Sequence, residues 1–178
     1  SLWCPDDKAE GWHREVVVGD MDKGHAGLQL LKAIITTVPG VPCIYQGDEY
    51  GVPGANDPDN RDMMRFEADN EHQTKEYAAT RALVKERRSS MPLMYGDYRT
   101  LYADDAAWVF VRHYMGEWSL VAMNVRGEAR SIEVELPSMA KCGDLDVAVA
   151  VEGATVECLG NGKLRVDVPA YGYMVVNK

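Results

Sequence analysis

The stretch that decides the fold is residues 41–66, which read VPCIYQGDEYGVPGANDPDNRDMMRF. It opens on a short apolar run, Cys43 to Tyr45, bounded by Pro and Gly, and such a run predicts a buried strand. Asp48 and Glu49 follow, and then a loop rich in Gly, Pro, Asn and Asp. Helical patterns lie on both sides. The stretch therefore predicts a helix–strand–loop–helix unit, in which ligand-binding groups sit in the loop after the strand.

The two flanking helices are predicted at residues 20–37 and 69–90. On the first, apolar residues recur at helical spacing, and Asp20 or Asp22 caps its start. His25 is expected to be a surface or first-turn residue. On the second, Tyr77, Arg81, Val84 and Arg88 line one face, with Ala78, Ala82 and Leu83 beside them. The basic end of that helix, Lys85, Arg87 and Arg88, suits the negative pole of the helix dipole and is expected to be solvated.

From about Pro92 the apolar period changes from 3.6 to 2, which indicates strands. Turn signals separate them, among them Met115-Gly116 and the hairpin signal Gly160-Asn161-Gly162. Short, regularly spaced strands predict an antiparallel sandwich. The strands are expected at 98–102, 108–114, 118–124, 131–136, 147–151, 155–159, 163–168 and 171–176.

Four segments carry a resemblance to a known family: 39–42, 44–45, 47–49 and 56–61. Together they resemble the eighth-strand region of the α-amylase family, glycoside hydrolase family 13. Residues 92–178, including the closing 168–172, resemble its C-terminal all-β domain. The resemblance implies an α+β chain: the end of a (β/α)8 barrel (helix–strand–helix), followed by an antiparallel β-sandwich.

Length limits how much of that family architecture the chain can hold. A full (β/α)8 barrel needs about 250 residues, and the chain has 178. We therefore expect residues 1–91 to form the incomplete C-terminal end of a barrel and residues 92–178 to form the sandwich. Ser1 is not an initiator, and the start looks like a cut boundary; we do not assign a compartment.

Asp57 and Arg61 are the predicted substrate-binding residues. They lie four residues apart in a turn-prone run, so an Asp and an Arg can meet on one side of a compact loop. A carboxylate held by a planar guanidinium is a fixed acceptor for sugar hydroxyls. The matching pair of the family lines the donor side near subsite −2 and breaks no bond. The alternative is a structural ion pair that holds the loop.

No catalytic residue is assigned. A retaining glycosidase needs two carboxyls about 5 Å apart, and the tempting pair is Asp48 and Glu49. Neighbours on an extended segment point to opposite faces, so we expect one to bind loop backbone and the other a cation. The family's catalytic set is two Asp and one Glu, one Asp following Asn-His. Residues 1–20 hold His13 without that motif, so the chain alone is predicted to be inactive.

The net charge and the spacing of the cysteines limit which ligands, metals and cofactors the chain is expected to bind. A net charge of −9 argues against nucleic acid and anionic membranes and fits a neutral ligand such as a sugar. Cys4, Cys43, Cys142 and Cys158 show no CxxC or Cys/His spacing, so no metal and no cofactor are predicted. They form either two disulfides or four thiols, and Cys43 is expected to be a packed thiol in the buried strand.

The leading hypothesis is the C-terminal part of a retaining glycosidase acting on α-glucans: starch, maltooligosaccharides or cyclodextrins. The alternative is a free-standing carbohydrate-binding or interaction module built on the sandwich. That module would need exposed aromatic side chains on one sheet face, and the candidates are Tyr98, Tyr102, Trp108 and Trp118. Trp3 and Trp12 are further candidates for sugar stacking. A third possibility is self-association through the exposed surface of the barrel remnant.

Overall fold

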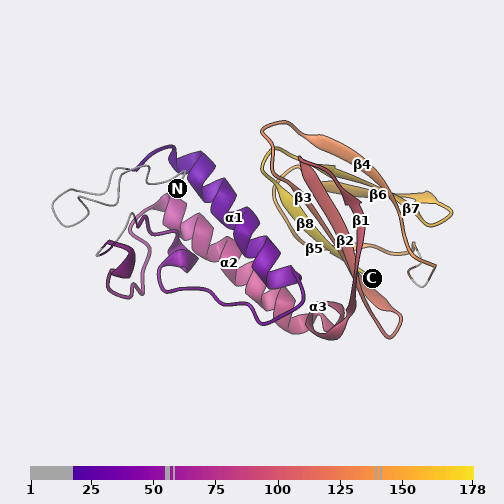
Figure 1. Cartoon of the computed structure of the whole chain (residues 1–178), viewed down its shortest axis with the longest axis horizontal. Helices are drawn as coiled ribbons and strands as arrows, with labels where there is room; N and C mark the ends of the chain where they lie inside the picture. Colours follow the sequence, from indigo (N-terminus) through magenta and orange to yellow (C-terminus); the bar gives the residue numbers. More distant parts are fainter. Residues whose placement is uncertain (1–17, 55–56, 58, 139, 141) are drawn as a thin grey trace. The chain divides into compact units, whose positions relative to one another are not determined.

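The computed structural model describes residues 18–54, 57, 59–138, 140 and 142–178. Helices come first and antiparallel strands follow, so the predicted α+β class is confirmed (Figure 1). The chain forms two compact units, one from the described residues of 1–32 and 43–81, the other from those of 33–42 and 82–178. The helical elements are α1 (Met21–Thr37), the 3-10 turns η2 (Asp48–Tyr50) and η3 (Asp59–Arg61), α2 (Glu71–Ser89) and α3 (Met91–Tyr95).

Both long helices begin near the predicted positions because a side chain caps each start. Asp20 Oδ1 accepts a hydrogen bond from Lys23 N at 3.0 Å, and Asn70 Oδ1 accepts one from Gln73 N at 3.0 Å. The short helix α3 was not predicted. Ser90 caps it by accepting from Leu93 N, and a proline fits its first turn. None of the helices in the described part of the chain has the length and apolarity needed to span a bilayer.

The buried face of α2 is not the face lined by Tyr77, Arg81, Val84 and Arg88. Tyr77 is 42% exposed, and Arg81 and Arg88 are exposed as well. The buried face lies about one position away and is mostly polar, so a search for apolar periodicity could not find it. Its residues are Gln73, Glu76, Thr80, Leu83 and Arg87.

The predicted buried strand at Cys43–Tyr45 is wrong. Residues 41–45 have no regular secondary structure, Val41 is 95% exposed and Tyr45 is 54% exposed. The thiol of Cys43 is free and exposed as well, not packed. A strand exists only where neighbours accept its backbone hydrogen bonds, and none of the described strands pairs with this segment.

Two buried guanidinium groups bind the carbonyls at the C-terminal end of α1. Arg87 donates to the carbonyl oxygens of Thr36 and Val38 at 3.2 and 3.0 Å, so its predicted solvation is wrong. Arg112, on strand β2 (Ala107–Tyr114), donates to Thr37 O at 2.8 Å and to Gly96 O at 2.9 Å. Burial lowers the pKa of both guanidinium groups. These donors satisfy carbonyls that a helix end leaves without intrahelical partners.

All eight predicted strands are present. A five-stranded sheet has the order β1-β2-β3-β8-β5, and a three-stranded sheet has the order β4-β7-β6 (Figure 1). Besides β2, the strands are β1 (Asp97–Ala103), β3 (Glu117–Asn124), β4 (Arg130–Glu135), β5 (Asp146–Ala150), β6 (Thr155–Gly160), β7 (Lys163–Val168) and β8 (Tyr173–Asn177).

The core of the sandwich is formed by alternate residues of both sheets. Val109, Trp118 and Leu120 of the larger sheet meet Leu164 and Val166 of the smaller one, and all five side chains are fully buried. Period-2 alternation puts these side chains on one face of each sheet. The apolar core therefore accounts for the all-β half in the way the sequence predicts.

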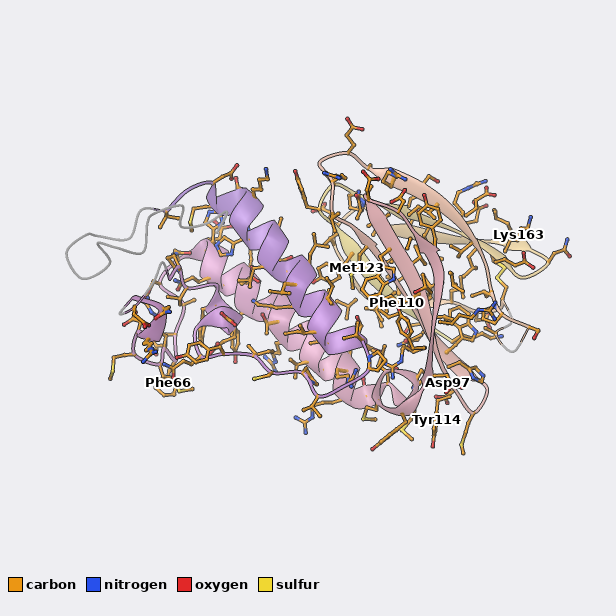
Figure 2. The ribbon with its side chains drawn as sticks, in the orientation of Figure 1. Phe66, Asp97, Phe110, Tyr114, Met123 and Lys163 are labelled. Carbon is orange, nitrogen blue, oxygen red and sulfur yellow. A yellow bond between two sulfur atoms is a disulfide. The ribbon has the colours of Figure 1, made fainter. Side chains whose placement is uncertain are left out.

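Turns and one disulfide close the sandwich. Gly160, Asn161 and Gly162 all have positive φ, which confirms the predicted hairpin before Lys163 (Figure 2). Cys142 and Cys158 form a disulfide across 16 residues, with their Cα atoms 6.3 Å apart. Cys4 lies outside the described residues. Because Cys142 and Cys158 are bonded while Cys43 is free, both predicted alternatives, two disulfides and four thiols, are wrong.

We predict that Arg112→Met lowers the free energy of unfolding by about 2–4 kcal/mol, because it leaves two buried carbonyls without their charged donor. Urea unfolding followed by circular dichroism measures the change. The control is Arg165→Met, because Arg165 pairs on the exposed surface with Glu133 and Glu157. This substitution should lower the free energy of unfolding by less than about 1 kcal/mol. Equal losses for the two variants would contradict the role given to Arg112.

Candidate functional site

The loop after the predicted strand position encloses a polar cavity of about 200 Å³. Gln46 Nε2 donates to Asp62 O at 2.8 Å and so ties the two arms of the loop together. The lining combines amide, carboxylate and hydroxyl groups with a few apolar side chains, which suits a polar uncharged ligand. The lining residues are Tyr45, Gln46, Gly47, Asp48, Val52, Pro53, Gly54, Asn60, Asp62 and Met63.

Asp57 and Arg61 form the ion pair that their spacing predicts. Arg61 Nε lies 3.0 Å from Asp57 Oδ1, and Arg61 Nη2 lies 3.4 Å from Asp57 Oδ2. The η3 turn ends at Arg61, and its neighbours Asn60 and Asp62 line the cavity. Asp57 and Arg61 themselves are not among the lining residues, so the pair is connected to the cavity through the backbone of Asn60 and Asp62. Both side chains are exposed, so the pair adds little stability by itself and its oxygens are accessible to a ligand.

A second ion pair fixes the far end of the loop. Arg65 lies 3.0 Å from Asp62 Oδ2 and also pairs with Asp69, just before α2. The hydrogen bonds from Arg65 and from Met63 N lower the pKa of Asp62. Asp62 therefore lines the cavity as a carboxylate, which can only accept hydrogen bonds.

Asp48 and Glu49 lie in the η2 turn, so the extended geometry expected for them is wrong. Both carboxylates accept from loop backbone: Glu49 Oε2 from Gly47 N at 2.8 Å, and Asp48 Oδ2 from Tyr45 N at 3.3 Å. Only one of them was predicted to do so. Desolvation raises the pKa of Asp48, while the Tyr45 amide and the charge of Lys32 oppose the rise. Both carboxylates thus shape the loop.

A buried polar network beneath the η2 turn was missed by sequence reasoning. Glu76 of α2 is fully buried, and its Oε1 accepts from Lys32 Nζ at 2.6 Å. His25 Nδ1 lies 3.0 Å from Glu76 Oε2, so His25 is not the surface residue that was predicted. Lys32 Nζ also donates to Thr80 Oγ1 at 2.8 Å. The available signal was spacing: His25 and Lys32 are seven residues apart on α1, and Glu76 and Thr80 four apart on α2, a helix-face repeat of polar groups.

The aromatic residues proposed to stack on a sugar differ in their exposure and in their hydrogen-bond partners. Trp118 is fully buried in the core, so it cannot stack on a ligand. Tyr102 donates its hydroxyl to Asp104, which also pairs with Arg130. Tyr98 is 39% exposed and lies 6.3 Å, centroid to centroid, from the half-buried Trp108. Trp3, Trp12 and His13 lie outside the described residues.

Within the described ranges, no group of three or more His, Cys, Asp or Glu side chains is arranged to hold a metal ion. Asp57 and Asp62 pair with guanidinium groups, and Asp48 and Glu49 accept from backbone amides. The loop therefore offers hydrogen-bond acceptors and a shaped cavity to a ligand.

Comparison with known proteins finds similar sequences and similar solved structures. No protein-family model matches the chain. It is 34% identical over 160 residues to a cyclomaltodextrinase of Geobacillus thermopakistaniensis, covering 88% of this chain and 25% of that protein. It is 34% identical over 99 residues to a cyclomaltodextrinase of Thermoanaerobacter pseudethanolicus, covering 56% of this chain and 17% of that one. The chain thus spans a quarter or less of the length of these two relatives.

A solved structure is also similar. The debranching enzyme of Nostoc punctiforme superposes with a TM-score of 0.75 at 27% identity, covering 86% of this chain and 31% of that one. The helices followed by antiparallel sheets therefore recur in an enzyme of known structure.

We predict that Asp48→Asn raises the melting temperature at pH 7, because it removes a carboxylate that desolvation disfavours while keeping an acceptor for Tyr45 N. The pKa of Asp48 is raised in the fold, so the penalty of ionisation is present above that pKa and disappears as pH falls through it. Thermal unfolding of both proteins from pH 7 to pH 4 should show the gain shrinking. A gain that grows toward pH 4 would contradict this.

Proposed function

We propose that the chain serves as the C-terminal portion of a retaining glycosidase of the α-amylase family (glycoside hydrolase family 13) that acts on α-glucans. In this proposal residues 1–91 complete a (β/α)8 barrel and residues 92–178 form the sandwich that follows it. The substrates are starch, maltooligosaccharides or cyclodextrins. The two cyclomaltodextrinases to which the chain is similar favour the last of these.

The observation that carries the proposal is the Asp57–Arg61 pair, which lies in the loop whose other residues line the polar cavity. A pyranose presents neutral hydroxyls, so recognition depends on fixed acceptors rather than on net charge. Arg61 holds the Asp57 carboxylate in one orientation, and that carboxylate accepts hydrogen bonds from two neighbouring hydroxyls of a glucosyl unit. We assign both residues to substrate binding on the donor side.

Bond cleavage is assigned to carboxylates outside residues 1–178. Retention requires a nucleophile and an acid/base about 5 Å apart, and Asp48 and Glu49 are both committed to backbone amides. The exposed apolar side chains Met63 and Phe66 support a barrel surface in this loop (Phe66 is labelled in Figure 2). In the proposed enzyme the rest of the barrel covers them, and in its absence a second copy of the chain does so by self-association.

We predict that residues 1–178 alone release no reducing sugar from soluble starch or from cyclodextrin. Incubation of the purified chain followed by a reducing-end assay tests this. Release above the buffer blank, abolished by Asp57→Ala, would show that a carboxylate of this loop takes part in cleavage and would overturn the assignment.

We further predict that Asp57→Ala weakens maltotriose binding about tenfold or more, because it removes a charged acceptor. Isothermal titration calorimetry on the chain measures this. The matched control is Asp105→Ala, since Asp105 forms a similarly exposed pair with Arg126 at 3.1 Å on the sandwich. The control should bind like the wild type. Equal affinity in all three proteins would refute substrate binding by Asp57.

The second candidate is a carbohydrate-binding module on the sandwich, and one cluster favours it. The hydroxyl of Tyr98 lies 2.8 Å from Thr100 Oγ1, and Trp108 Nε1 donates to the same oxygen at 3.4 Å. Aromatic faces beside hydroxyls suit a stacked sugar ring. Loss of maltotriose binding in Tyr98→Ala, with Asp57→Ala unaffected, would select this candidate over the first.

A further inference from the structure

The buried charges between α1 and α2 lie under the loop that carries the proposed binding groups. Lys32 is 2% exposed and Glu76 is fully buried. Burying an ion pair costs several kcal/mol per ion in desolvation before the mutual attraction is counted, so such a pair is weak evidence for stability alone. Apolar side chains would fill the same space at less cost. A role beyond packing is therefore worth seeking.

Three contacts connect this pair to the η2 turn. The Thr80 hydroxyl, which accepts from Lys32 Nζ at 2.8 Å, lies 3.4 Å from the carbonyl oxygen of Glu49. The charge of Lys32 also acts on Asp48 and Glu49, whose carboxylates in turn raise the pKa of Lys32 against the larger lowering by burial. The Lys32 ammonium, the Thr80 hydroxyl and the η2 turn are thus neighbouring polar groups.

The third contact is steric and lies at Gly51, the residue that ends the turn. Its φ is +65°, and a Cβ built there would stand 2.8 Å from His25 Cε1 and 3.1 Å from Glu76 Cγ. His25 is in turn held by Glu76, with Nδ1 and Oε2 3.0 Å apart. The backbone of the turn therefore rests directly on the imidazole and on the Glu76 side chain.

The turn also determines where the cavity begins. Backbone bonds close it: Gly51 N donates to Asp48 O at 3.0 Å, and Val52 N donates to Gly47 O at 3.0 Å. Gly47, Asp48 and Val52 line the cavity. A shift of the turn would thus move one wall of the cavity relative to the Asp57–Arg61 pair on the other arm of the loop.

We infer that Lys32, Glu76, His25 and Thr80 are positioning residues that hold the η2 turn, and with it the glucan-binding loop, in its binding geometry. This inference rests on the proposed function of the loop. None of the four lines the cavity or touches the ligand in this scheme. They act through Glu49 and Gly51, and the buried charge is retained because it fixes geometry rather than because it adds stability.

The test compares Lys32→Met with Lys75→Met by amide hydrogen exchange and by maltotriose titration. Lys32 is on α1, and Lys75 pairs with Glu71 at 2.8 Å on the exposed side of the neighbouring helix α2. The same chemical change at Lys75 is therefore a matched control on the surface. We expect Lys32→Met to speed exchange at the amides of Gly51 and Val52 about tenfold, with sheet amides unchanged, and to weaken maltotriose binding about fivefold or more. Lys75→Met should change neither.

A second variant keeps the inference testable if Lys32→Met does not fold. Thr80→Val keeps the shape of the side chain and the Lys32–Glu76 pair. It removes the hydroxyl that accepts from Lys32 Nζ, donates to Glu76 O at 2.8 Å and faces Glu49 O at 3.4 Å. It should speed exchange in the same turn by a smaller factor and weaken maltotriose binding in the same direction. Because the ion pair remains, the melting temperature should fall less than in Lys32→Met.

The outcomes separate the inference from the proposed function. Unchanged exchange in the turn, or equal acceleration across the whole chain, would overturn the positioning role. If Lys32→Met speeds exchange only in the turn and the wild-type chain binds no maltotriose, the glucan-binding proposal is refuted. The control of loop geometry by the buried residues would still stand. Faster exchange with unaltered maltotriose affinity would refute the link between the turn and the ligand.

Discussion

The first unit depends on one constraint: the Glu76 carboxylate is fully buried and must be satisfied there. An uncompensated buried charge would cost several kcal/mol. Lys32, His25 and Gln29, all on α1, supply the partners. Because hydrogen bonds are directional, this set permits one register of α1 against α2. An apolar interface would allow α1 to shift along α2. The buried hydrogen bonds fix the register of the two helices, and so they fix the position of the η2 turn that packs on them.

The second unit meets a related problem at the end of α1. Terminal carbonyls that finish inside a protein need donors, and Arg87 and Arg112 provide them. Gly96 is part of this arrangement, because its carbonyl accepts from Arg112 and a Cβ there would stand 2.4 Å from Pro92 O. The two sheets themselves hold together through an apolar core. Hydrogen bonds from Arg87 and Arg112 therefore hold the C-terminal end of α1, and apolar burial holds the two sheets of the sandwich together.

The proposed binding groups are borne by a loop, while the rigid elements carry the residues that position it. This division is common, because a loop can present side chains that a helix face cannot, provided that a scaffold removes its freedom. The exposed Asp57–Arg61 pair adds little to stability. Its value in the proposed enzyme is geometric, and that geometry originates in side chains buried beneath the loop.

The sequence by itself determined most of the secondary structure and the sandwich. Capping residues such as Asp20, period-2 alternation and positive-φ turn residues act within a few positions of the chain, so they can be read without a partner. The i, i+4 meeting of Asp57 with Arg61 is local in the same sense. The resemblance to the α-amylase family likewise rested on short segments within 39–61 and on the strand pattern of residues 92–178.

Only the tertiary structure decided what each element packs against. Cys43 to Tyr45 reads as a strand, yet strand formation depends on neighbours that lie elsewhere. Arg87 reads as a solvated cap, yet it is buried because the end of α1 offers it carbonyls. Glu76 reads as a surface charge, and its partner Lys32 lies 44 residues earlier in the chain. Such partners are chosen by packing between distant segments, and a local sequence pattern carries no record of that choice.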